Sequence, residues 1–131
     1  MVERGRLKLR EHLDGGSELI YYERPQSPAV RESRYHRVAV SPEAAGLLRA
    51  TLRHVAVVEK TRRLFVWRSV RIHLDSVDGL GSFLELEAVA TPGSDLAEER
   101  VAVDHLRRVL EIRDEDLVGE GYAELGRRRR R

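Results

Sequence analysis

Short segments in which polar and apolar residues alternate recur along this chain, and they restrict its fold more than any other feature. A period of two places successive side chains on opposite faces of a β-strand. Turn-forming residues separate the segments, such as Asp14, Gly15 and Gly16 after the first one. The sequence therefore predicts strands over residues 6–11, 18–24, 33–40, 55–65 or 55–67, 70–75 and 83–90.

Helical signals occupy the remaining parts of the chain. Ser41 as N-cap and Pro42 in the first turn predict a helix after the third strand. Apolar residues at helical spacing predict a longer helix over 95–111, and a short one is expected over 121–125. A strand-rich order with one inserted helix and helices at the end indicates an α+β fold with an antiparallel sheet.

The chain has 131 residues and shows no internal repeat, which favours one domain over residues 1–126. Residues 127–131 are all arginine and contribute +5 to a net charge of +2, so the remainder carries −3. We expect these five to form a disordered basic tail, and we expect no dedicated nucleic-acid surface. The absence of cysteine excludes disulfides and thiolate zinc sites. No apolar run has the length of a membrane span or a signal peptide, so a cytoplasmic protein without membrane contact is expected.

One face of the expected sheet collects ionisable side chains, and their signs are segregated. The cations cluster on the first four strands, with Arg71 on the fifth, whereas the acids cluster on the last two. Each side chain is assigned to this face by the parity of its position. The cations are Lys8, Arg10, Arg24, Arg31, Lys60, Arg62 and Arg71, and the acids are Asp75, Glu85 and Glu87.

Two interpretations of this face remain open. In an ordinary one-sided sheet it would simply meet water. Alternatively, the sheet closes with its charged face inward and forms a tunnel suited to a polyphosphate. Arginine and lysine then bind phosphate oxygens, and the three acids supply hard oxygen ligands for Mg²⁺ or Mn²⁺. His73 and Asp75 lack a serine in a nucleophile elbow, so the sequence does not favour a hydrolase triad.

Several segments resemble the CYTH domain, the triphosphate tunnel family. "VVEKTRRLF" and "VRIHLDSVDGLGSFLELE" are similar to its C-terminal half. "GRLKLRE", "LIYYERP" and "RESRYH" resemble the earlier strands of its class IV adenylyl cyclase branch, and "GEGYAEL" resembles its closing tyrosine segment. The resemblance runs from Gly5 to about Leu125.

The resemblance implies a closed antiparallel barrel with helices packed outside and divalent-metal-dependent work on ATP or another triphosphate. Members make cyclic AMP from ATP, or hydrolyse thiamine triphosphate or tripolyphosphate. Position by position, it implies that Lys8, Arg10, Lys60 and Arg62 are tunnel-wall cations and that Arg24 and Arg31 are further basic positions. It implies metal binding by Asp75, Glu85 and Glu87, with Arg71 and His73 on the same wall.

The chain departs from the family at its start, because residues 1–131 contain no E-x-E-x-K strand. We therefore expect a barrel that is incomplete at the N-terminus, since closing one around a ligand takes about eight strands. A misassigned start or truncation, closure by a second copy in a homodimer, and a degenerate protein without catalysis are three explanations. Enzyme activity is expected but depends on which holds. The alternatives are cyclisation, hydrolysis, and binding of polyphosphate or nucleotide without turnover.

Overall fold

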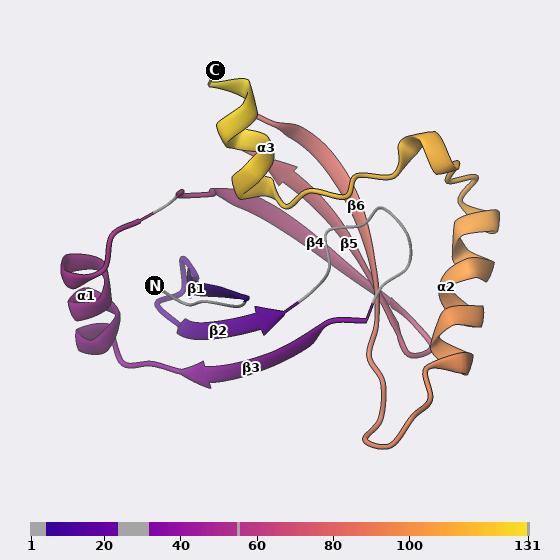
Figure 1. The fold of residues 1–131 in the computed structure, drawn as a ribbon, viewed down its shortest axis with the longest axis horizontal. Helices are drawn as coiled ribbons and strands as arrows, with labels where there is room; N and C mark the ends of the chain where they lie inside the picture. The colour runs from indigo at the N-terminus through magenta and orange to yellow at the C-terminus, as the bar shows by residue number, and fades with distance from the viewer. Residues whose placement is uncertain (1–4, 24–31, 55, 131) are drawn as a thin grey trace. The chain divides into compact units, whose positions relative to one another are not determined.

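The computed structural model describes residues 5–23, 32–54 and 56–130, and its α-helices and strands are labelled in Figure 1. In chain order they are β1 (Arg6–Glu11), β2 (Ser17–Glu23), β3 (Arg34–Ala39), α1 (Pro42–Thr51), β4 (Lys60–Trp67), β5 (Val70–Val77), β6 (Gly81–Ala88), α2 (Ala97–Val109), the 3₁₀ turn η1 (Asp114–Asp116) and α3 (Tyr122–Arg129). The α+β class with antiparallel sheets is confirmed.

The chain divides into two compact units, residues 1–55 and 56–131. Each unit carries one three-stranded antiparallel sheet, in the orders β1-β2-β3 and β4-β5-β6. Within the described residues no strand pairing joins the two sheets, so the closed barrel stays a prediction.

The first sheet begins with a hairpin whose turn is stabilised by its own residues. Gly15 at the turn has a φ of 94°, which glycine adopts without strain, and the Asp14 side chain accepts a hydrogen bond from the amide of Gly16. The register then pairs Arg10 with Glu18 across β1 and β2. After β3, the Ser41 hydroxyl accepts a hydrogen bond from the amide of Ala44 and caps α1, as the sequence predicts.

The second sheet differs from the prediction at its first strand. The sequence favours a strand from residue 55, but β4 begins at Lys60. The reason is the register, because Lys60 pairs with Val77, the last residue of β5. A turn follows Val77, so the described residues 56–59 have no opposing strand with which to form a ladder.

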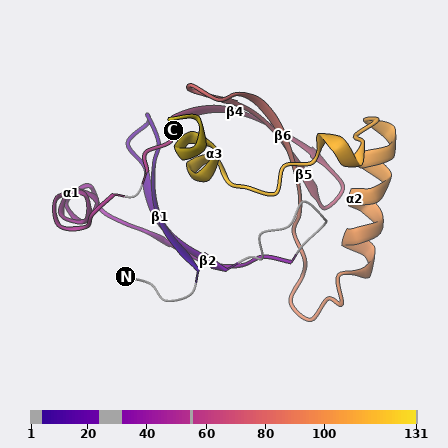
Figure 2. The ribbon, with the colours of Figure 1, turned by 45° about the horizontal axis from the view of Figure 1, so that its top comes forward.

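A small core joins α2 to one face of the second sheet. Val70 is completely buried and packs with Val103 and Leu106 of α2, together with Trp67 and Leu86. In Figure 2, α2 runs alongside the β4-β5-β6 sheet. This is the face opposite to the charged one, so α2 covers the apolar side as the predicted arrangement requires.

Three of the C-terminal arginines lie in a helix, where the sequence predicts a disordered tail. Arg127, Arg128 and Arg129 lie in the last turn of α3. Arg128 forms an ion pair with Glu120 at 2.9 Å, and Arg129 donates to the carbonyl of Gly79 at 3.0 Å. These partners offset the repulsion among like charges, and cations at a helix C-terminus are stabilised by its dipole. Among the residues described here, no helix is long and apolar enough to cross a membrane.

Candidate functional site

The second sheet brings its predicted charged residues onto one face through its register. Arg62 of β4 lies opposite Asp75 of β5, and Asp75 lies opposite Phe83 of β6. Two positions further along, on the same face, His73 lies opposite Glu85. The alternation predicted from the sequence is therefore correct for these strands, and neighbouring strands bring its polar positions together.

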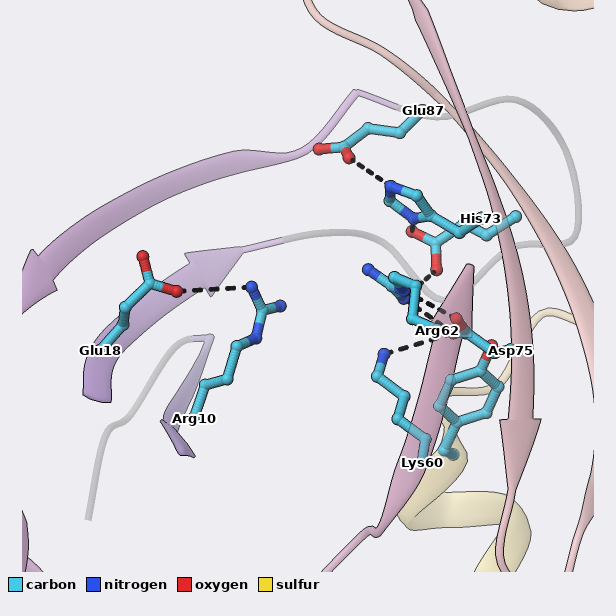
Figure 3. A network of polar contacts seen from close by, with 9 residues as sticks. Arg10, Glu18, Lys60, Arg62, His73, Asp75 and Glu87 are labelled. Atoms are coloured by element: carbon cyan, nitrogen blue, oxygen red, sulfur yellow. Dashed lines mark hydrogen bonds and ion pairs between the residues drawn. The ribbon is translucent and has the colours of Figure 1, made fainter. Parts of the chain in front are cut away.

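Asp75 is the centre of this face, and its carboxylate has no exposed surface. Arg62 donates from Nε to Oδ1 and from Nη2 to Oδ2, each at 2.7 Å. Lys60 donates to Oδ2 at 3.3 Å, and the hydroxyl of Tyr122 donates to the same oxygen at 2.8 Å. Figure 3 shows Lys60 and Arg62 converging on Asp75. A buried carboxylate requires such donors, because ionisation without them is costly.

The electrostatics of the cluster follow from this geometry. Burial opposes ionisation of Asp75, but the hydrogen bonds from Arg62 and Tyr122 and the charge of Lys60 outweigh it and hold the pKa of the carboxyl well below its usual value. Burial, the bond to Asp75 and its negative charge raise the pKa of Tyr122, so the phenol stays protonated as a donor. Burial and the neighbouring Arg62 lower the pKa of Lys60, against the pull of Asp75.

His73 is also buried and lies between two glutamates. Its Nε2 is 3.5 Å from Oε2 of Glu87, and its Nδ1 is 4.0 Å from Oε1 of Glu85. In the described part of the chain, Nδ1 has no hydrogen-bond partner. Burial and the charge of Arg62 lower the pKa of His73, although the two glutamates oppose them.

The three predicted metal ligands are not gathered into one cluster. Glu85 and Glu87 share the face at positions i and i+2, whereas Asp75 is engaged by two cations and a phenol. No group of three metal-ligating side chains occurs within residues 5–23, 32–54 and 56–130. Mg²⁺ is commonly held by only one or two carboxylates together with substrate phosphates. The two glutamates fit that arrangement, but the described residues do not form a cage of their own.

The first unit carries two further predicted cations. The ammonium of Lys8 lies 5.8 Å from the centre of the Tyr22 ring. Arg10 is 3.5 Å from Glu18, which also accepts a hydrogen bond from Arg37 (Figure 3 shows the pair of Arg10 and Glu18). The bond from Arg37 lowers the pKa of Glu18, although burial opposes it. The sequence analysis overlooked this acid among the cations of the first sheet.

Of the remaining three predicted cations, the structure describes only one. Arg71 pairs with Glu87 across β5 and β6, on the charged face. Arg24 and Arg31 lie outside the described residues. Tyr122 is the main residue that the sequence analysis missed as part of the site. Its signal was the "GEGYAEL" segment, in which the family resemblance marked a tyrosine without giving it a role.

The fold and this face define an α+β protein with antiparallel sheets, one of which holds a buried aspartate together with cations and further acids on a single face. A family model described as the CYTH domain matches residues 1–122. The chain therefore belongs to the CYTH family, whose members generally bind triphosphates and depend on a metal.

Two solved structures from Pyrococcus share the fold. The PH1012 protein from Pyrococcus horikoshii OT3 superimposes with a TM-score of 0.76 at 23% identity, covering 95% of this chain and 76% of that one. A conserved hypothetical protein from Pyrococcus furiosus gives a TM-score of 0.72 at 19% identity, covering 95% and 77%. No curated protein matches the sequence.

Proposed function

We propose that this protein binds a triphosphate on the charged face of the β4-β5-β6 sheet and converts it chemically. The observation that carries the proposal is the buried carboxylate of Asp75 with Lys60 and Arg62 fixed against it. Arg62 also lies 3.6 Å from Glu85 on the same face, so the cations stand beside acids that can hold a metal ion. This arrangement suits a polyanionic ligand that binds together with a metal, because the cations are already positioned before it binds.

Lys60 and Arg62 are the proposed phosphate ligands on this sheet. Their side chains are 23% and 25% exposed, so each is held from within while part of it reaches solvent. A guanidinium has five N–H donors and an ammonium three. Both therefore keep donors for phosphate oxygens while they are bound to Asp75.

Glu85 and Glu87 are proposed to hold Mg²⁺ or Mn²⁺ together with the phosphates, in line with the hard oxygen donors that these ions prefer. When bound, the ion would neutralise phosphate charge and polarise a phosphoryl oxygen. A role of Asp75 as a third metal ligand, expected from the family resemblance, remains part of the proposal.

The reaction we favour is that of a class IV adenylyl cyclase, because the first strands resemble that branch. The ribose 3′-oxygen of ATP would attack the α-phosphate, and pyrophosphate would leave. Lys60 and Arg62 would stabilise the charge that develops on the leaving group. Hydrolysis of thiamine triphosphate or tripolyphosphate is the alternative, in which water replaces the ribose oxygen, and binding without turnover is the third outcome.

Support for the remaining positions comes from the family resemblance alone. The proposal includes Lys8, Arg10, Arg24, Arg31 and Arg71 as further triphosphate-binding cations within a barrel-type tunnel. It places the protein in the cytoplasm with ATP as partner, and it includes a homodimer. Sedimentation of the full chain with and without ATP measures the oligomeric state.

Turnover assays test the proposed function directly. The full chain is incubated with Mg²⁺ or Mn²⁺ and ATP, thiamine triphosphate or tripolyphosphate, while cyclic AMP, pyrophosphate and phosphate are followed. Cyclic AMP from ATP supports the cyclase, whereas orthophosphate supports the hydrolase. A double variant, Glu85→Ala with Glu87→Ala, should lose metal-dependent turnover. If it behaves like the parent protein, the metal assignment is wrong.

A further inference from the structure

We infer that Tyr122 is a positioning residue of the triphosphate site, an inference that rests on the function proposed above. Its hydroxyl keeps the buried Asp75 hydrogen-bonded while Lys60 turns from Asp75 to a phosphate. The residue comes from α3 and lies 47 positions after Asp75 in the sequence. The C-terminal helix thereby takes part in binding without touching the ligand.

The first step is the crowding at one oxygen of Asp75. Oδ2 accepts from Arg62 at 2.7 Å, from Tyr122 at 2.8 Å and from Lys60 at 3.3 Å. An ionised carboxylate offers about four acceptor positions on its two oxygens. Oδ1 accepts one bond, from Arg62, whereas the three donors on Oδ2 exceed the two positions of that oxygen. The contact from Lys60 is the longest of them and lies just beyond the usual range for N–H···O bonds.

Lys60 is therefore the donor that a phosphate recruits most readily. Its ammonium is compact, carries three donors on a flexible stem and is partly exposed. Arg62, in contrast, holds both oxygens of Asp75 in a planar fork, which is harder to separate. When Lys60 turns to a ligand, Asp75 must keep its other donors, because an unsatisfied buried acceptor is unfavourable.

Tyr122 is suited to stay hydrogen-bonded to Asp75 when Lys60 turns to a phosphate. It is a neutral donor, so a negatively charged ligand competes for it less than for a cation. Its ring packs against Phe83 of β6, with the centres 5.0 Å apart and the planes tilted by 53°. The ammonium of Lys60 lies 5.2 Å from the centre of the same ring. This cation–π contact guides Lys60 over the ring and does not depend on its bond to Asp75.

The test uses Tyr122→Phe, which removes the hydroxyl and keeps the ring. Binding of tripolyphosphate to the full chain is measured by calorimetry in EDTA, so that no metal contributes. We expect the variant to bind about tenfold more weakly than the parent, the size of effect that loss of one hydrogen bond to a charged group produces. Tyr21→Phe is the matched control, since the Tyr21 hydroxyl donates to another carboxylate, Glu23, at 2.6 Å. This control should bind like the parent.

The outcomes separate the inference from the proposed function. If the parent binds and Tyr122→Phe binds equally well, the inference is overturned and the function stands. If the parent binds tripolyphosphate neither in EDTA nor with Mg²⁺, the proposed function fails, and the inference fails with it.

A structure of the parent with tripolyphosphate provides a second measurement, which does not require the variant to fold. The inference predicts Lys60 on a phosphate oxygen and Tyr122 still on Asp75. It is overturned if Tyr122 has left Asp75 or if Lys60 has stayed on it.

Discussion

Arg62 of β4 donates hydrogen bonds of 2.7 Å to both carboxylate oxygens of Asp75 on the neighbouring strand. The pair stands directly opposite in the register of the second sheet. Because Asp75 is buried while Arg62 reaches solvent, the acid organises the cation from within.

Removing Asp75 should destabilise the second unit. Asp75→Ala leaves Lys60 and Arg62 as partly buried cations without their carboxylate, and we expect a loss of about 3 kcal/mol of unfolding free energy. Urea unfolding at pH 7 measures it. Asp104→Ala, which removes an exposed aspartate of α2, should change the free energy by less than about 0.5 kcal/mol. Equal effects of the two substitutions would show that the cluster does not stabilise the fold.

Low pH should decrease the unfolding free energy through protonation of Asp75. The pKa of Asp75 is lowered in the folded state, so its stabilising contribution is present above the unfolded value of about 4. As the pH falls below that value, protons bind first to the unfolded chain and the contribution is lost. In urea unfolding between pH 6 and pH 3, Asp75→Asn should lose less stability than the parent. Parallel curves for the two proteins would contradict the assignment.

His73 should make the unfolding free energy depend on pH in a range above that of Asp75. Burial and Arg62 lower the pKa of His73, against the glutamates Glu85 and Glu87, so the folded protein favours the neutral imidazole. Its contribution is present above about pH 6.5 and declines as the pH falls, because the unfolded chain takes up the proton first. His73→Gln should flatten the stability curve between pH 7 and pH 5. His54→Gln controls for loss of an exposed imidazole, and a parent-like slope in His73→Gln would be inconsistent with this account.

The contact of α2 with the sheet should depend on one side of the helix. Val103→Ala removes a side chain that is only 7% exposed in the core, and we expect a loss of about 2 kcal/mol from transfer and cavity terms. Val101→Ala, at a site that is 66% exposed on the same helix, should be neutral or slightly stabilising, because alanine favours helix. Thermal or urea unfolding compares the two. If Val101→Ala loses more unfolding free energy than Val103→Ala, the side of α2 that carries Val103 is not the one that packs on the sheet.

Local patterns were sufficient to predict much of the fold. The alternation of "RLKLRE" predicts β1 with the bounds that the structure has, and Ser41 caps α1 as expected. The start of β4 could not be predicted in the same way. Residues 56–59 carry a strand-like sequence, but a ladder also needs an opposing strand, and the partner β5 ends at Val77.

The candidate site was predictable in its composition but not in its pairing. Parity assigns Arg62 and Asp75 to one face, yet only the register shows that they are direct neighbours. The contribution of Tyr122 depends on where α3 meets the sheet, which no periodicity encodes. The prediction of a disordered tail was wrong for the arginines of α3, because repulsion between like charges was considered without their acidic neighbours, such as Glu120.

The most direct test of the central claim compares two adjacent arginines on opposite faces of β4. Arg62 lies on the charged face, whereas the guanidinium of Arg63 lies 5.8 Å from the centre of the Phe65 ring on the other. Binding of tripolyphosphate by calorimetry is measured for the parent, Arg62→Gln and Arg63→Gln, each with its folding checked by circular dichroism. We predict that Arg62→Gln binds at least about tenfold more weakly, as expected for loss of a charge-assisted contact, and that Arg63→Gln binds like the parent. Equal affinities of both folded variants, or no binding by the parent, would contradict a triphosphate site on this face.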